Sequence, residues 1–154
     1  MNTRLIVTPL AAVAKKAAPS LNDLITNYLA AIRKSLVDVG ISINHKVVDM
    51  PDCVNRKNIV LEFFRGEQRL GSAIRSIDSE AQILRLSTIG LDGGTGILRP
   101  LYKAESTFAN QAGLNVRSRL ANAKTEAKFR EFYPGFQSLK GGRTLLWIHP
   151  NNRS

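Results

Sequence analysis

The sequence predicts an α/β fold in which helices flank a central, mostly antiparallel mixed sheet. The first third of the chain contains one long segment with apolar residues at helical spacing. Three strand-like segments then follow one another through short polar turns, an arrangement typical of antiparallel pairing. Strands alternate with helices only in the second half, so we expect one mixed sheet with few crossover connections.

Composition predicts one domain covering residues 1–154, long enough to build its own core. The single Cys53 excludes an internal disulfide, and His45 and His149 lie too far from other candidate ligands for a zinc motif, so we expect no metal. A reducing, cytoplasmic location follows from this cysteine usage. The alternative is a signal peptide around residues 5–14, which Thr8 and Pro9 interrupt. No apolar stretch approaches the roughly 20 residues of a membrane helix.

The chain is a basic protein, with 22 Lys and Arg against 12 Asp and Glu and a formal charge of +10. Such a charge attracts polyanions, which include nucleic acids, acidic proteins and phosphate-bearing coenzymes. Nucleic acid is the less favoured of these, because the basic residues are scattered and aromatics make up only 6% of the chain with no repeated stacking pattern.

The clearest predicted element is a helix over residues 20–40. Ser20 is an N-cap candidate with Asp23 three residues later, and Gly40 marks the C-terminal end. The apolar face comprises Leu21, Leu24, Ile25, Tyr28, Leu29, Ile32, Leu36 and Val37. Because the other face is polar, this helix should pack against the rest of the domain. Upstream, a short strand is predicted over residues 3–8.

Strands dominate the middle of the chain. An extended segment is predicted over residues 41–50, followed by a loop. Residues 58–64 and 70–77 flank a polar turn around Gly66 and predict an antiparallel hairpin. A third strand is expected over residues 82–89.

A glycine-dense loop over residues 90–96 then leads into a helix predicted over residues 97–111 and ended by Gly113. A strand, a glycine-rich turn and a helix together present unpaired backbone N–H groups at the positive end of a helix dipole, which suits phosphate oxygens. Neither the P-loop nor the dinucleotide fingerprint fits this loop. The remaining predicted elements are a strand at 114–120, a helix at 123–132, an extended piece at 136–139 and a strand at 144–149.

From residue 82 to residue 149 the sequence resembles the GNAT (N-acetyltransferase) superfamily. The family motif runs from a strand through Arg or Gln, two variable residues, Gly, any residue, and Gly or Ala into a helix. Here Gly93 stands at the Arg/Gln position, Gly96 at the first glycine and Leu98 at the second, so the loop is degenerate. Downstream, Asn122 and Tyr133 followed by Gly-Phe match the family's later pattern.

The resemblance implies an acetyl-CoA-dependent N-acyltransferase acting on an amine of a protein, peptide or small metabolite. It implies that the first half forms the acceptor side and residues 82–149 the acetyl-CoA side. Tyr133 would donate a proton to the leaving thiolate. The implied cofactor-binding residues are Gly93, Gly94, Thr95, Gly96, Ile97, Leu98, Arg99 and Asn122, with Arg117, Arg119 and Lys124 nearby.

Three points stay open at this stage. The general base is Glu62 in our working assignment, with Asp78 and Glu80 as alternatives on or beside the same strands. The bulk of Leu98 is expected to crowd a pyrophosphate. A catalytically inactive GNAT-like module that binds a regulatory protein partner is the alternative function, and a homodimer is compatible with either.

Overall fold

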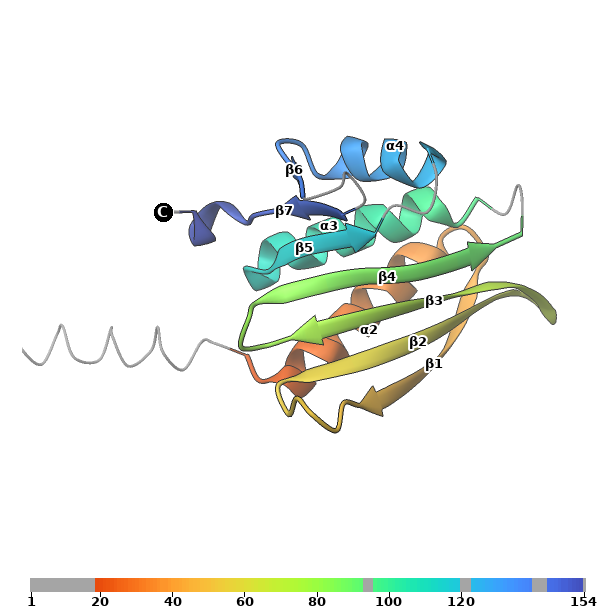
Figure 1. The fold of residues 1–154 in the computed structure, drawn as a ribbon. Helices are drawn as coiled ribbons and strands as arrows, with labels where there is room; N and C mark the ends of the chain where they lie inside the picture. Colours follow the sequence, from red (N-terminus) through yellow and green to blue (C-terminus); the bar gives the residue numbers. More distant parts are fainter. Residues whose placement is uncertain (1–18, 93–95, 120–122, 140–143, 154) are drawn as a thin grey trace, which may run out of the picture.

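The computed structural model describes residues 19–92, 96–119, 123–139 and 144–153. These residues form a seven-stranded sheet in the order β1-β2-β3-β4-β5-β7-β6, shown in Figure 1. The predicted strand at residues 3–8 and the signal-like segment lie outside the described residues. The strands are β1 Ser42–Asp49, β2 Arg56–Arg65, β3 Gln68–Asp78, β4 Ile83–Leu91, β5 Asn115–Arg119, β6 Gln137–Ser138 and β7 Thr144–Trp147.

The long predicted helix is α2, Leu21–Val37. The Ser20 hydroxyl accepts a hydrogen bond from the Asp23 backbone N–H at 3.1 Å, which satisfies one of the free donors at the helix start. Its apolar stripe is buried, with Tyr28, Ile32 and Leu36 fully enclosed. The periodicity of the sequence therefore predicted both the helix and the face that packs on the sheet.

Strands β1 to β4 form an antiparallel meander. Side chains alternate between two faces, and one face of β2 buries Ile59, Leu61 and Phe63 against the helices. We call this the inner face. In Figure 1, α2 and α3 lie behind these strands, and no helix of the described chain lies in front of them. The opposite, outer face is therefore open to solvent along much of the meander.

Helix α3, Leu98–Ala112, ends at Gly113, which adopts a left-handed φ of 73° that glycine tolerates without a steric penalty. It packs along α2, and the chain then enters β5 parallel to β4. Helix α4, Ala123–Phe132, packs against α3. The short 3-10 helix η2, Pro150–Asn152, follows β7.

The predicted fold class is confirmed: a mixed sheet, mostly antiparallel, with β4–β5 as the parallel pair among the described strands. The helix boundaries agree with the predicted ones within one residue, except at the end of α2, which stops at Val37, three residues before the predicted end at residue 40. None of the described helices is long and apolar enough to cross a membrane.

Candidate functional site

Strands β4 and β5 pair over only four residues, from Ile83 opposite Asn115 to Leu86 opposite Ser118. β4 then continues to Leu91, whereas β5 ends one residue later, at Arg119. A β-bulge at Ser87 shifts the register of β4 against β3 at the point where the strands part. Residues 87–91 thus have no strand partner on the β5 side within the described chain, and we call them the open edge of β4.

The N-terminus of α3 follows the open edge along the chain. Its N-cap is Ile97, whose side chain forms no capping hydrogen bond, and the first turn contains no acidic residue. Gly96 precedes it with a φ of 72°, and a Cβ at this position would meet no described atom within 4 Å. Among the described residues, no side chain caps the first N–H groups of the helix, which suits an anion.

Ile97 and Leu98 point their side chains into the core, where they are 0% and 9% exposed. The bulk of Leu98 lies among the buried residues of the inner face, and its predicted crowding of a pyrophosphate stays a prediction. Arg99 is exposed, but its guanidinium forms a 2.7 Å ion pair with Glu131 and lies over the Phe132 ring. The start of α3 is thereby tied to α4.

A buried ion pair supports the bulge from behind. Arg75 of β3 and Glu105 of α3 are almost completely enclosed, with Nε–Oε2 and Nη2–Oε1 distances of 2.7 and 3.2 Å. Tyr28 donates to the same carboxylate at 2.6 Å. Burial alone would lower the pKa of Arg75, and the Glu105 carboxylate instead raises it above its usual value. Arg75 Nη1 also donates to the Thr88 carbonyl at 3.0 Å, so this pair fixes the open edge of β4.

Tyr133 lies one residue past the end of α4, within the inner-face core, and packs on Phe129 and Trp147. It is 0% exposed, and its hydroxyl has no hydrogen-bond partner among the described residues. Burial, followed by the charge of Glu105, raises its pKa well above the usual value, so the phenol keeps its proton at neutral pH. A buried, protonated hydroxyl without a partner can donate a hydrogen bond to a group that a ligand brings near it.

On the outer face, a hollow of about 380 Å³ lies where β4 and β5 part. We call it the arginine hollow; it is lined by Arg56, Arg85, Leu86, Ser87, Thr88, Arg117, Arg119 and Thr144. Four guanidinium groups and three hydroxyls line it, and no carboxylate does. It is an anion-binding candidate on the face of the sheet opposite the helices, and it shares Ser87 and Thr88 with the open edge of β4.

Glu62 lies on the outer face of β2, level with Ser72 and, through it, with Gly90 of the open edge. With strands about 4.8 Å apart, this places it roughly 10 Å from β4. It forms a half-exposed ion pair with Arg69 at 3.0 Å. The other candidate bases are occupied elsewhere: Asp78 accepts two backbone N–H groups of the β3–β4 turn, and Glu80 accepts from Asn55.

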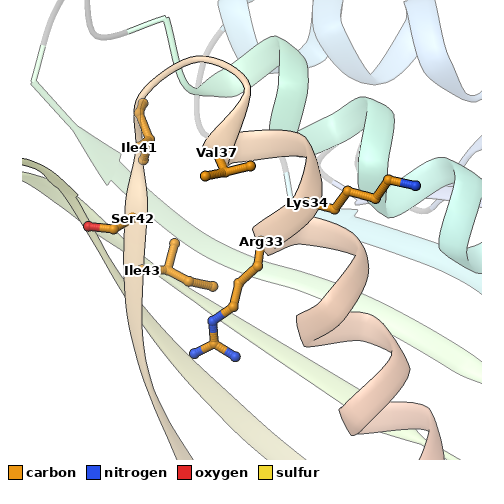
Figure 2. A pocket seen from close by; sticks show the side chains of 6 residues that line it. All are labelled: Arg33, Lys34, Val37, Ile41, Ser42 and Ile43. Carbon is orange, nitrogen blue, oxygen red and sulfur yellow. The ribbon is translucent and has the colours of Figure 1, made fainter.

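A second hollow, of about 400 Å³, lies between the end of α2 and β1. Figure 2 shows Val37 and Ile43 between the two elements, whereas Lys34 points away. Its lining is mainly aliphatic, and its six residues, Arg33, Lys34, Val37, Ile41, Ser42 and Ile43, include no carboxylate.

The structure brings Gly96, Ile97, Leu98 and Arg99 together at the start of α3 and places Tyr133 in the core beneath; Gly93, Gly94, Thr95 and Asn122 lie outside the described residues. Among the described residues, no group of three or more His, Cys, Asp or Glu side chains could hold a metal ion. Arg56, Arg85 and Ser87 were missed from the sequence. Their signal was alternation: Arg85 and Arg117 each sit between residues of a buried face and so share the opposite one.

No protein-family model and no curated protein sequence matches the chain. A solved structure to which it is similar is that of nourseothricin acetyltransferase, with 15% sequence identity and a TM-score of 0.43 over 72% of this chain and 88% of that one. A likeness this distant says nothing about the chemistry of the site.

Proposed function

We propose that this chain is a cytoplasmic, single-domain, acetyl-CoA-dependent N-acyltransferase acting on an amine of a protein, peptide or small metabolite. The observation that carries the proposal is the open edge of β4, which is followed along the chain by the N-terminus of α3. The first turn of α3 contains no acidic residue, and its N-cap Ile97 forms no capping hydrogen bond. The helix start suits phosphates. The unpaired backbone of residues 87–91 suits an extended, amide-containing chain, which can hydrogen-bond to it as an added strand would. Coenzyme A combines both groups in one ligand.

The residues present fit such a coenzyme. Backbone N–H groups at Leu98 and Arg99 would hold its phosphates, because both side chains are turned away, Leu98 into the core and Arg99 toward Glu131. Gly93, Gly94, Thr95 and Asn122 stay predicted contacts. When bound, acetyl-CoA supplies the acetyl group as a thioester.

Proton handling is assigned to Tyr133 and Glu62. Tyr133 would donate a hydrogen bond to the developing thiolate and so stabilise it as it leaves. Its hydroxyl, which has no partner among the described residues, supports this assignment. Glu62 would accept the amine proton. Because roughly 10 Å separates it from β4, that transfer requires a water relay.

Calorimetric titration with acetyl-CoA tests the proposal, using Gly96→Asp and Gly96→Asn as a matched pair. Both residues tolerate the left-handed backbone of Gly96, and only Asp adds a negative charge in front of α3. We expect micromolar binding to the native chain and to the Asn variant, and a loss of about tenfold or more in the Asp variant. A charge-matched nucleotide should bind more weakly.

Absence of binding beyond the nucleotide control would overturn the enzyme assignment. It would favour the alternative function, a catalytically inactive module that binds a regulatory protein. The next experiments would then be the capture of a protein partner and a measurement of whether the chain forms a homodimer.

A further inference from the structure

The arginine hollow lies on the face of the sheet opposite the helices. Arg85 alternates with the buried Leu84 and Leu86, and its neighbour Arg117 alternates with the buried Val116 and Ser118. The start of α3 belongs to the inner side. The molecule therefore has two anion-receptive places, the start of α3 on the inner side and the arginine hollow on the outer side, and the hollow shares Ser87 and Thr88 with the open edge of β4.

Within the part of the chain that the structure describes, the guanidinium groups of the hollow have no ion-pair partner. None of its four guanidinium groups forms an ion pair with a described residue, in contrast to Arg69, Arg75, Arg99 and Arg130. The Nε atoms of Arg56 and Arg85 are buried without a hydrogen-bond partner, and so is the hydroxyl of the neighbouring Ser76. Buried donors left unpaired cost free energy, and a ligand that supplies acceptors recovers it.

Electrostatics agree with this geometry. Partial burial, followed by the positive charges of Arg56 and Arg117, lowers the pKa of Arg85. Asp78 acts in the opposite direction and offsets part of this repulsion. The cluster is thus a group of mainly like charges held together by the strands, and an anionic ligand would add to the compensation.

We propose that the arginine hollow binds the phosphate group of a small, phosphate-bearing acceptor amine, while the coenzyme uses the α3 side. This inference rests on the proposed function and adds the substrate class. Phosphate fits better than a carboxylate, because several guanidinium forks converge and a phosphate offers three acceptor oxygens and up to two charges. No aromatic side chain lines the hollow, so it lacks the stacking platform of a single-stranded nucleic-acid site.

The test uses the full chain and inorganic pyrophosphate as the probe, by calorimetry at near-physiological salt. The variant is Arg85→Gln/Arg117→Gln. The control is Lys34→Gln/Lys103→Gln, which removes the same charge from exposed positions on the helices. We expect binding to the native and control chains and at least about a tenfold loss in the arginine variant, the size expected for charge-assisted hydrogen bonds. Equal affinity in all three chains would overturn the proposal.

A second titration adds pyrophosphate to the chain saturated with acetyl-CoA. Retained pyrophosphate affinity, within about threefold, supports two separate sites; full competition would mean that the hollow holds the coenzyme's own phosphates and would overturn the proposal. If acetyl-CoA fails to bind while pyrophosphate binding still depends on Arg85 and Arg117, the anion site stands and the acyltransferase assignment falls. Binding of a duplex oligonucleotide but not of pyrophosphate would replace the small acceptor with nucleic acid.

Discussion

Arg75 on the inner face of the sheet and the arginines of the arginine hollow on the outer face differ in how their charges and donors are satisfied. On the inner face Arg75 is enclosed, and Glu105 and the Thr88 carbonyl satisfy its guanidinium. On the outer face Arg56 and Arg85 crowd together, and their buried Nε atoms have no partner. The charge of Arg75, which stabilises the fold, is neutralised by the buried carboxylate of Glu105. The arginines of the arginine hollow form no ion pair with a described residue, as expected of residues that serve a ligand.

The largest expected effect is on the inner face. Arg75→Ala leaves the Glu105 carboxylate buried without its counter-ion, so we expect a loss of about 3–5 kcal/mol in the free energy of unfolding. Urea denaturation followed by circular dichroism measures it. Arg69→Ala is the matched control, because its half-exposed pair with Glu62 should contribute at most about 1 kcal/mol. Equal losses would erase the contrast between buried and exposed pairs.

Tyr133→Phe separates stability from catalysis. Removing an unpartnered hydroxyl should leave the free energy of unfolding unchanged or raise it by about 1 kcal/mol. If Tyr133 donates the proton, the rate constant of acetyl transfer should fall by about 10²–10⁴-fold with little change in acetyl-CoA affinity. A variant that is less stable and equally active would assign Tyr133 to the core alone.

The next effect concerns the open edge of β4. A Cβ added at Gly71 would lie 2.2 Å from the Gly90 carbonyl oxygen, at a φ of 145°, so Gly71→Ala should cost about 1–3 kcal/mol. Gly90→Ala is the control, because a Cβ there meets nothing within 4 Å. Comparing the thermal midpoints of both variants tests whether β3 and β4 approach this closely. Similar midpoints would contradict that approach.

The smallest effect is expected in the arginine hollow. Arg85→Gln removes repulsion from Arg56 and Arg117 and loses some packing, so the free energy of unfolding should stay equal or rise by at most about 1 kcal/mol. Differential scanning calorimetry at low and high salt resolves this change, which salt should diminish. A loss well above 1 kcal/mol would make Arg85 a structural residue like Arg75.

Local sequence signals predicted most of the elements. The periodicity and N-cap of α2, the turn at Gly66 and the end of α3 at Gly113 all depend on neighbouring residues, and the structure confirms them. The site was harder, because it depends on contacts between distant segments. The bulge at Ser87 becomes visible only when β3 and β4 are aligned.

Two side chains illustrate the same limit. The motif alignment placed Leu98 at the coenzyme's phosphates, but a spacing gives no side-chain direction, and the core takes this side chain. The burial of Tyr133 results from its packing against Trp147 of β7, a contact between two elements that the local sequence does not reveal.

Arg85 and Arg117 were each predictable as strand residues, whereas their adjacency required the parallel register of β4 and β5.

The most direct test of separate binding at the start of α3 and in the arginine hollow is an amide nitrogen–proton correlation spectrum of the full chain, titrated separately with acetyl-CoA and pyrophosphate. We predict that acetyl-CoA shifts the amides of Leu98, Arg99 and the open edge of β4, and that pyrophosphate shifts those of Arg85 and Arg117 while leaving the start of α3 unchanged. Shifts of Leu98 and Arg99 with pyrophosphate, or no shift at the open edge of β4 with acetyl-CoA, would contradict the account.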